Sequence, residues 1–123
     1  MVGQALARDD RDHGVKSMSR EDLLDAVASG RVLVIDVRPA DEYAARHLPG
    51  AVSLPLDELR RRLDDVPADQ EVVAYCRGRV CELSHEAVEL LRSRGIEARA
   101  TADGILDWRA DGIELVPVVA GHP

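Results

Sequence analysis

Two short apolar runs constrain the fold of this chain more than any other feature of its sequence. Residues 32–35 read Val-Leu-Val-Ile, and residues 72–75 read Val-Val-Ala-Tyr. Neither run alternates apolar with polar side chains, so each predicts a strand that is buried on both faces. Strands of this kind are typical of a parallel sheet that helices cover on both sides.

Helical and strand patterns alternate around these two runs. Ser19 is a typical helix cap, and Gly30 is a typical residue just after a helix end. Further helices are predicted over residues 39–45, 56–63, 82–94 and 105–110, and further strands over residues 52–54 and 98–100. The sequence therefore predicts an α/β fold with a small, mainly parallel central sheet of about five strands and helices on both faces.

The composition fits one globular domain with short tails. Of the 123 residues, 46% are hydrophobic and 32% are charged, which is a globular balance. We expect a flexible polar tail over residues 1–17, one domain over residues 18–119 and a C-terminal tail over residues 120–123. The net charge of −7 and the scarcity of aromatic residues disfavour direct contact with nucleic acid. The sequence shows neither a membrane-spanning run nor a secretory signal, which favours a cytoplasmic protein.

Cys76 is the candidate catalytic residue because it directly follows the second apolar run and precedes a strong helix. In open α/β sheets, ligands collect at the carboxyl ends of the strands. Gly78 lets the backbone turn tightly behind Cys76, so that successive N–H groups can converge on an anion. Arg77 and Arg79 add two cations, although the chain as a whole is acidic. All of these features favour the thiolate, which is the nucleophilic form of cysteine.

A second cysteine leaves the behaviour of this cysteine loop, residues 76–81, open. Val80 and Cys81 complete the loop. Cys81 can form a disulfide with Cys76 if their Cα atoms lie within about 7 Å, which would make it a resolving thiol in a redox or persulfide sensor or relay. Alternatively, Cys81 is a partly buried thiol at the start of the following helix. Both alternatives remain open.

Other cysteine and metal chemistries are disfavoured by specific positions. A cysteine phosphatase, or an arsenate reductase of that type, needs an arginine six residues after the nucleophile to hold the oxyanion, and that position is Glu82. No metal site is predicted, because Cys76, Cys81 and His85 offer too few ligands. Glu89 also stands where a zincin-type motif starting at His85 would need its second histidine.

Several motifs, taken together in this order, resemble the rhodanese superfamily of sulfurtransferases. They are Ile-Asp-Val-Arg at residues 35–38, Glu-Tyr at 42–43, His-Leu-Pro-Gly-Ala at 47–51, Val-Ala-Tyr-Cys-Arg at 73–77, and Gly104, Trp108 and Gly112. The cysteine loop, followed by Leu-Ser-His-Glu-Ala at residues 83–87, is similar to rhodanese domains fused behind winged-helix repressors of the arsenical-resistance type.

This resemblance implies a two-step transfer of sulfur and no cofactor. Cys76 would attack the outer sulfur of thiosulfate or of a persulfide and become a persulfide, from which a thiol or cyanide removes the sulfur. The implied partners are a small anionic sulfur donor and a thiol acceptor, either a small molecule or a protein. The backbone amides of residues 77–81 would hold the donor anion, while Arg77 and Arg79 would orient it.

Four further residues are expected around the site, namely Asp36, Arg38, Glu42 and His47. Asp36 and Arg38 would tie the end of the first buried strand to the cysteine loop, or form a buried ion pair with a purely structural role. Glu42 provides a carboxylate whose partner the sequence does not identify. His47 precedes a Pro-Gly turn and is expected to anchor that turn by a hydrogen bond.

Overall fold

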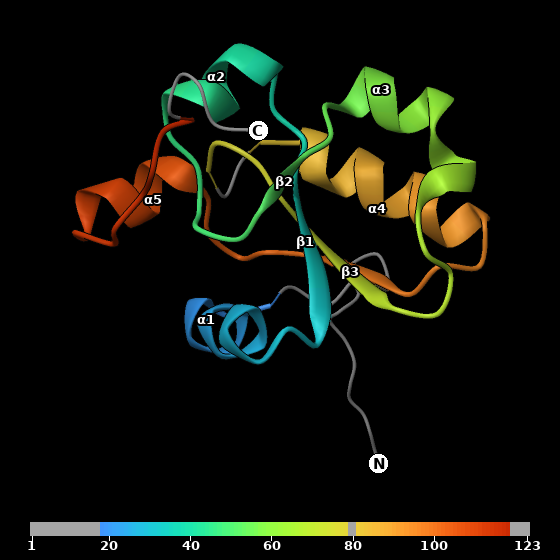
Figure 1. The fold of residues 1–123 in the computed structure, drawn as a ribbon, viewed down its shortest axis with the longest axis horizontal. Coiled ribbons are helices and arrows are strands. Elements are labelled where there is room, and N and C mark those ends of the chain that lie inside the picture. The colour runs from blue at the N-terminus through green and yellow to red at the C-terminus, as the bar shows by residue number, and fades with distance from the viewer. Residues whose placement is uncertain (1–17, 79–80, 119–123) are drawn as a thin grey trace.

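The computed structural model of the chain describes residues 18–78 and 81–118, in which strands and helices alternate (Figure 1). The helices are α1 (Arg20–Ser29), α2 (Ala40–Ala45), α3 (Leu56–Arg61), α4 (Leu83–Ser93) and α5 (Ile105–Ala110), with a short 3-10 helix at Leu63–Asp65. The strands are β1 (Val32–Asp36), β2 (Val52–Ser53), β3 (Glu71–Tyr75) and β4 (Ala98–Ala100). The predicted tails over residues 1–17 and 120–123 lie outside the described residues.

The central sheet is parallel throughout, with the strand order β2-β1-β3-β4. Ile35 on β1 pairs with Val52 on one side and with Ala74 of β3 on the other, and Ala74 pairs in turn with Ala100. This arrangement confirms the predicted α/β fold. Because neighbouring strands run in the same direction, their carboxyl ends meet at one edge of the sheet.

The sheet has four strands among the described residues, where about five were predicted. The remaining edge position is taken by Met18, which makes a single parallel bridge with Thr101. The Met18 N–H donates to the carbonyl of Ala100 at 2.9 Å. Ser19 caps α1 by accepting a hydrogen bond from the Asp22 N–H, so the chain leaves the sheet directly after Met18.

Helix boundaries follow local capping signals, with one difference from the prediction. Gly30 ends α1 in the left-handed conformation, at a φ of 70°, as its position predicted. The helix predicted over residues 56–63 is shorter, because α3 ends at Arg61 and a 3-10 turn follows. Leu63 is buried in that turn and keeps the apolar spacing that suggested a longer helix.

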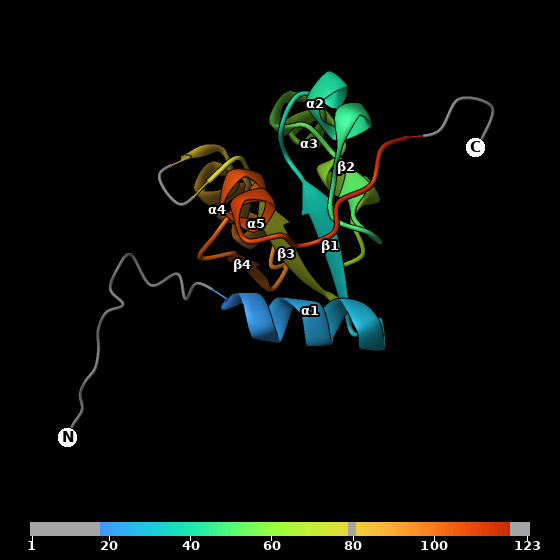
Figure 2. The same ribbon diagram turned by 90° about the vertical axis from the view of Figure 1, so that its left-hand side faces the viewer.

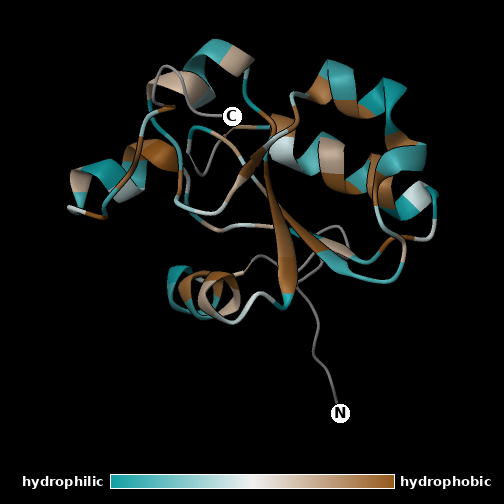
Figure 3. Cartoon of the chain, viewed as in Figure 1, coloured by the Kyte–Doolittle hydropathy of each residue, from teal (hydrophilic) through white to brown (hydrophobic). Residues whose placement is uncertain are grey.

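Helices cover both faces of the sheet, which explains why its two central strands carry continuous apolar runs. In Figure 1, α1 and α5 lie on one side of β1 and β3 while α3 and α4 lie on the other, and Figure 2 shows the α1 and α5 side. Val34 and Tyr75 belong to the apolar cluster on the α1 and α5 side, and Ile35 and Ala74 belong to the cluster on the α3 and α4 side. The hydropathy colouring of Figure 3 shows β1 as apolar along most of its length.

Two further features place the site within this fold. Cys76 belongs to the cluster on the α3 and α4 side, so its side chain points away from α5. Trp108 on α5 packs edge-to-face against Tyr75 on the opposite side, with ring centroids 5.1 Å apart. No helix of the described part of the chain combines the length and the apolar character that crossing a membrane requires.

We expect Leu91→Ala to lower the free energy of unfolding by about 2–5 kcal/mol, because Leu91 is fully buried and the truncation leaves a cavity beneath α4. Urea unfolding followed by circular dichroism measures this loss. Leu106→Ala is the matched control, because that side chain is 60% exposed and its removal should change stability by less than about 0.5 kcal/mol. Equal losses in the two variants would contradict the proposed core.

Candidate functional site

The cysteine loop begins at the carboxyl end of β3, in the middle of the sheet edge where the neighbouring strands also end. Cys76 follows Tyr75 directly and is only 1% exposed. The chain leaving β1 lies beside it, because the Val37 N–H donates to the Tyr75 carbonyl at 3.2 Å. The structure therefore places Cys76 where open α/β sheets bind their ligands.

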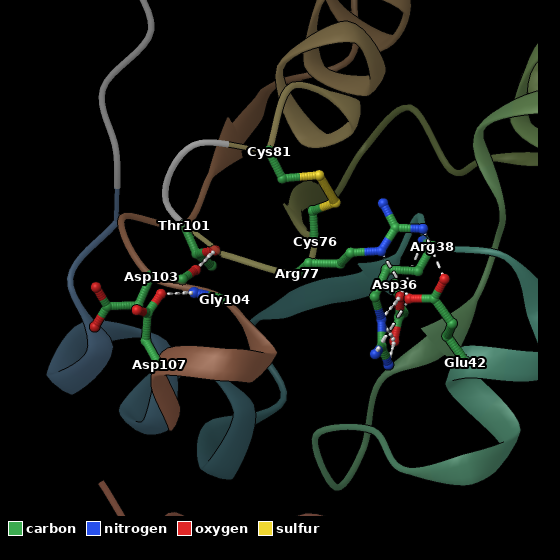
Figure 4. Close-up of a disulfide and its surroundings, with 10 residues drawn as sticks. All are labelled: Asp36, Arg38, Glu42, Cys76, Arg77, Cys81, Thr101, Asp103, Gly104 and Asp107. Atoms are coloured by element: carbon green, nitrogen blue, oxygen red, sulfur yellow. Dashed lines mark hydrogen bonds and ion pairs between the residues drawn. A yellow bond between two sulfur atoms is a disulfide. The ribbon is translucent and has the colours of Figure 1, made fainter. Parts of the chain in front are cut away.

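The start of α5 holds the first part of the cysteine loop from one side (Figure 4). The N–H of Ile105 donates to the Cys76 carbonyl at 3.1 Å, and the N–H of Leu106 donates to the Arg77 carbonyl at 2.7 Å. In a trans peptide the N–H points opposite to the carbonyl, so the N–H groups of Arg77 and Gly78 face away from α5. In Figure 4 the two cysteine sulfur atoms also lie away from α5.

Gly104 is the residue that allows α5 to approach the loop this closely. A Cβ atom at this position would lie 2.5 Å from the Gly78 nitrogen and 2.6 Å from both the Arg77 carbonyl carbon and the Cys76 oxygen. These are backbone atoms, so no side-chain movement could relieve the clash. The Asp107 carboxylate accepts the Gly104 N–H at 3.0 Å and fixes the turn into α5.

Cys76 and Cys81 form a disulfide in this structure, with their Cα atoms 6.2 Å apart. The loop between them folds back on itself, because the Cys81 N–H donates to the Gly78 carbonyl at 3.2 Å. Cys81 is partly buried and packs against the apolar cluster that contains Cys76. Of the two alternatives that the sequence left open, this structure contains the disulfide. Arg79 and Val80, the other predicted loop residues, lie outside the described residues.

Asp36 and Arg38 form a buried ion pair at the end of β1. Asp36 is fully buried and Arg38 is 4% exposed, and the Arg38 guanidinium donates to the two carboxylate oxygens at 2.9 and 2.7 Å. Arg38 also donates to the Arg46 carbonyl at 2.7 Å. Burial disfavours the charge on Arg38, but its hydrogen bonds and attraction to Asp36 raise its pKa. The predicted pairing is present, and it holds the residues that follow β1 against the end of that strand.

The Tyr75 hydroxyl, on the neighbouring strand, is buried and feels the charge of the same carboxylate. It accepts the Leu48 N–H at 3.0 Å. Burial raises the pKa of Tyr75, and the negative charge of Asp36 raises it further, so the hydroxyl stays protonated. Tyr75 thus links the ends of β1 and β3 immediately before Cys76.

Glu42 on α2 is paired with Arg77 of the cysteine loop. The Arg77 Nε and Nη2 atoms donate to the two Glu42 oxygens at 2.9 and 2.6 Å, and Arg38 lies 3.9 Å from the same carboxylate. Hydrogen bonds from Arg77 hold the pKa of Glu42 below its usual range, and Glu42 raises the pKa of Arg77. Charges of alternating sign therefore run from Asp36 to Arg77. Figure 4 shows the Arg77 side chain directed toward Glu42 rather than over the sulfur of Cys76.

His47 contacts α2 and the C-terminal segment rather than the cysteine loop. Its Nδ1 is 2.9 Å from the Tyr43 carbonyl oxygen, and its ring stacks on Tyr43 with centroids 3.8 Å apart. The His47 backbone forms an antiparallel bridge with Val116. His47 thus joins α2 to the C-terminal segment, and its ring hydrogen bond goes to α2 rather than to the Pro-Gly turn that it was expected to anchor.

The structure adds Tyr75, Gly104 and Asp107 to the predicted surroundings of Cys76. Gly104 was part of a recognised motif, but its contact with the loop was not predicted. One available signal was its position after β4, because the carboxyl ends of parallel strands meet at one edge. Within residues 18–78 and 81–118, no group of three or more His, Cys, Asp or Glu side chains could hold a metal ion.

A family model described as a rhodanese-like domain matches residues 19–111. The chain belongs to the rhodanese-like family.

Three relatives show which proteins carry this domain. The chain is 41% identical over 107 residues to the HTH-type transcriptional regulator Rv0324 of Mycobacterium tuberculosis, covering 87% of this chain and 46% of the regulator. It is 31% identical to a sulfurtransferase of Allochromatium vinosum, covering 69% of this chain and 78% of that protein. It is also 31% identical to the human thiosulfate:glutathione sulfurtransferase, covering 77% of this chain and 94% of that enzyme. The predicted likeness to rhodanese domains of transcriptional repressors is confirmed by the regulator, of which this chain spans about half the length.

Solved structures share the same fold. The BH2092 protein of Bacillus halodurans matches with a TM-score of 0.76 at 22% identity, covering 89% of this chain and 82% of that one. A rhodanese-like domain protein of Staphylococcus aureus matches with a TM-score of 0.70 at 28% identity, covering 84% of this chain and 98% of that one.

We expect Gly104→Ala to lower the free energy of unfolding by at least about 1–3 kcal/mol, because the added Cβ collides with the backbone of the cysteine loop. Urea unfolding measures the loss. Gly78→Ala is the matched control: its φ is not positive, and its Cβ would only touch Asp107 at 3.7 Å. A loss in Gly104→Ala no larger than in Gly78→Ala would show that α5 does not confine the loop.

We expect the ion pair of Glu42 with Arg77 to stabilise the fold at neutral pH but not in acid. Since the pair lowers the pKa of Glu42 in the folded state, its contribution is present above the unfolded pKa and is lost as the pH falls through the folded pKa. Glu42→Gln should lower the free energy of unfolding by about 0.2–1 kcal/mol at pH 7. It should have no effect well below about pH 4, where the Glu42 carboxyl is protonated in both the folded and the unfolded state. Urea unfolding across this pH range tests the trend. The exposed Glu89→Gln is the control, and a cost that does not depend on pH would refute this account.

Proposed function

We propose that this domain is a sulfurtransferase in which Cys76 carries sulfane sulfur as a persulfide. The observation that carries the proposal is the position of Cys76 at the carboxyl end of β3, in a rhodanese-family loop whose first two carbonyls are bound by α5. With these carbonyls occupied, the N–H groups of Arg77 and Gly78 are left to face an anion on the other side of the loop. Such preorganised donors stabilise negative charge that develops on a bound sulfur group.

The proposed reaction has two steps once the disulfide is reduced. The Cys76 thiolate attacks the outer sulfur of thiosulfate, the sulfur–sulfur bond of thiosulfate breaks, and sulfite leaves with the bonding electrons. An acceptor thiolate then attacks the outer sulfur of the Cys76 persulfide, and the Cys76 thiolate leaves. Cyanide can replace the acceptor thiol and is converted to thiocyanate.

The substrate classes follow from charge and from the relatives. Two relatives are named as sulfurtransferases, one of them a thiosulfate:glutathione sulfurtransferase, which supports an anionic sulfane donor and a thiol acceptor. We propose thiosulfate or a small persulfide as the donor, and no direct contact of this domain with nucleic acid or a membrane. Because the disulfide must be reduced before Cys76 can accept sulfur, we assign the reaction to a reducing compartment such as the cytoplasm.

A second candidate is a sensor or relay module in which the oxidation state of Cys76 and Cys81 is the signal. The disulfide favours it, and so does the likeness to a transcriptional regulator. Such a module would change state once per stimulus, whereas an enzyme turns over many times. The two candidates therefore differ in the amount of product formed per chain.

We expect the reduced chain, freed of reductant, to form thiocyanate from thiosulfate and cyanide over many turnovers. Cys76→Ser should reduce the rate to that of the uncatalysed reaction, because serine is a far weaker nucleophile and cannot form a persulfide. Thiocyanate is measured as its iron complex, and urea unfolding of both proteins serves as the control for folding. Product limited to one equivalent per chain would favour the sensor. No product and no sulfur adduct from thiosulfate or from glutathione persulfide would refute the sulfurtransferase.

A further inference from the structure

We propose that Cys81 resolves the persulfide on Cys76 within the same loop, releasing sulfide and closing the Cys76–Cys81 disulfide. This inference rests on the proposed function, because it needs a persulfide on Cys76. It adds a reaction that consumes this persulfide without any external acceptor. The pairing of the two cysteines in the structure carries it.

The fold already brings the two sulfur atoms together. The Cα atoms of Cys76 and Cys81 are 6.2 Å apart, within the range of about 4.4–6.8 Å that disulfides require. The hydrogen bond from the Cys81 N–H to the Gly78 carbonyl holds the backbone of Cys81 beside Gly78, two residues after Cys76. On the other side, Ile105 and Leu106 hold the carbonyls of Cys76 and Arg77. These backbone hydrogen bonds therefore position the two cysteines so that their sulfur atoms can meet.

Burial gives Cys81 an advantage over a thiol from solution. Cys76 is 1% exposed, and Cys81 packs beside it in the same apolar cluster. An acceptor from solution must first reach this buried sulfur, whereas Cys81 is already in place. A group held beside its target reacts at a higher effective concentration than a dilute acceptor in solution. Resolution by Cys81 should therefore compete with transfer whenever the acceptor is dilute.

The chemistry differs from transfer in the sulfur that is attacked. The Cys81 thiolate attacks Sγ of Cys76, which is the inner sulfur of the persulfide. The bond between Sγ and the outer sulfur breaks, and the outer sulfur leaves with the electron pair as hydrosulfide. The two cysteines together lose two electrons, and the sulfane sulfur gains them. The Cys76 persulfide anion and the Cys81 thiol thus become one disulfide and one hydrosulfide ion, so no oxidant is needed.

This reaction makes the loop self-limiting. In the absence of an acceptor, each reduced chain releases one sulfide and then has no free thiol, because the chain contains only these two cysteines and both are in the disulfide. A dithiol reductant must reopen the disulfide before a new sulfur can be accepted. The same residues can therefore transfer sulfur when an acceptor is abundant and record sulfane sulfur as a disulfide when it is scarce.

The test is a single-turnover reaction of the full chain under anaerobic conditions. Reduced, desalted protein is mixed with one equivalent of thiosulfate, and intact mass, released sulfide and released sulfite are followed over time. The wild type should release one sulfide and one sulfite per chain and lose two hydrogens in mass. Cys81→Ser should release sulfite, keep one added sulfur atom and release no sulfide. Cys76→Ser should do none of these.

The possible failures are distinguishable. If Cys81→Ser gains a sulfur atom and the wild type keeps the same adduct equally long without sulfide, resolution by Cys81 is wrong and the sulfurtransferase stands. A disulfide that forms without one equivalent of sulfide also overturns the inference. If neither protein gains sulfur or releases sulfite, the proposed function fails with it. Cys81→Ala repeats the test with a side chain that cannot attack, and urea unfolding verifies that each variant is folded.

Discussion

The site depends on one contact, the packing of the start of α5 against the backbone of the cysteine loop. Gly104 brings the two backbones within the distance that any Cβ would occupy, and the N–H groups of Ile105 and Leu106 then bind the carbonyls of Cys76 and Arg77. Because a trans peptide opposes its carbonyl and its N–H, this contact also sets the direction of the loop amides. The close approach at Gly104 thereby sets which way the N–H groups beside Cys76 point.

The charged residues around the loop form a chain of ion pairs and hydrogen bonds that leads from the end of β1 to the cysteine loop. Asp36 and Arg38 form a buried ion pair, and Glu42 lies 3.9 Å from Arg38 and accepts hydrogen bonds from Arg77. With its guanidinium occupied by Glu42, Arg77 contributes positive charge beside the loop without lying over the sulfur. Donor orientation by Arg77 or Arg79 stays a prediction.

The two cysteines fit both of the functions proposed for this domain, sulfur transfer and sensing. In the proposed chemistry, an acceptor thiol attacks the outer sulfur of the Cys76 persulfide, whereas Cys81 attacks the inner sulfur. One loop would therefore support both sulfur transfer and disulfide formation. The chain resembles sulfurtransferases along most of their length and a transcriptional regulator along 46% of its length. The concentration of acceptor would decide between the two outcomes.

The apolar runs at residues 32–35 and 72–75 indicated the parallel sheet by themselves, because consecutive apolar side chains need cover on both faces of a sheet. The sequence also predicted the place of Cys76 at the end of a buried strand and before a helix, since this position is local information. The number of full strands, the break after α3, the partner of Glu42 and the role of Gly104 depend on residues that are distant in the chain, so only tertiary packing decided them. The disulfide belongs to this second group: spacing allowed both a free and a bonded Cys81, and the folding of the loop against α5 and α4 brought the two sulfurs together.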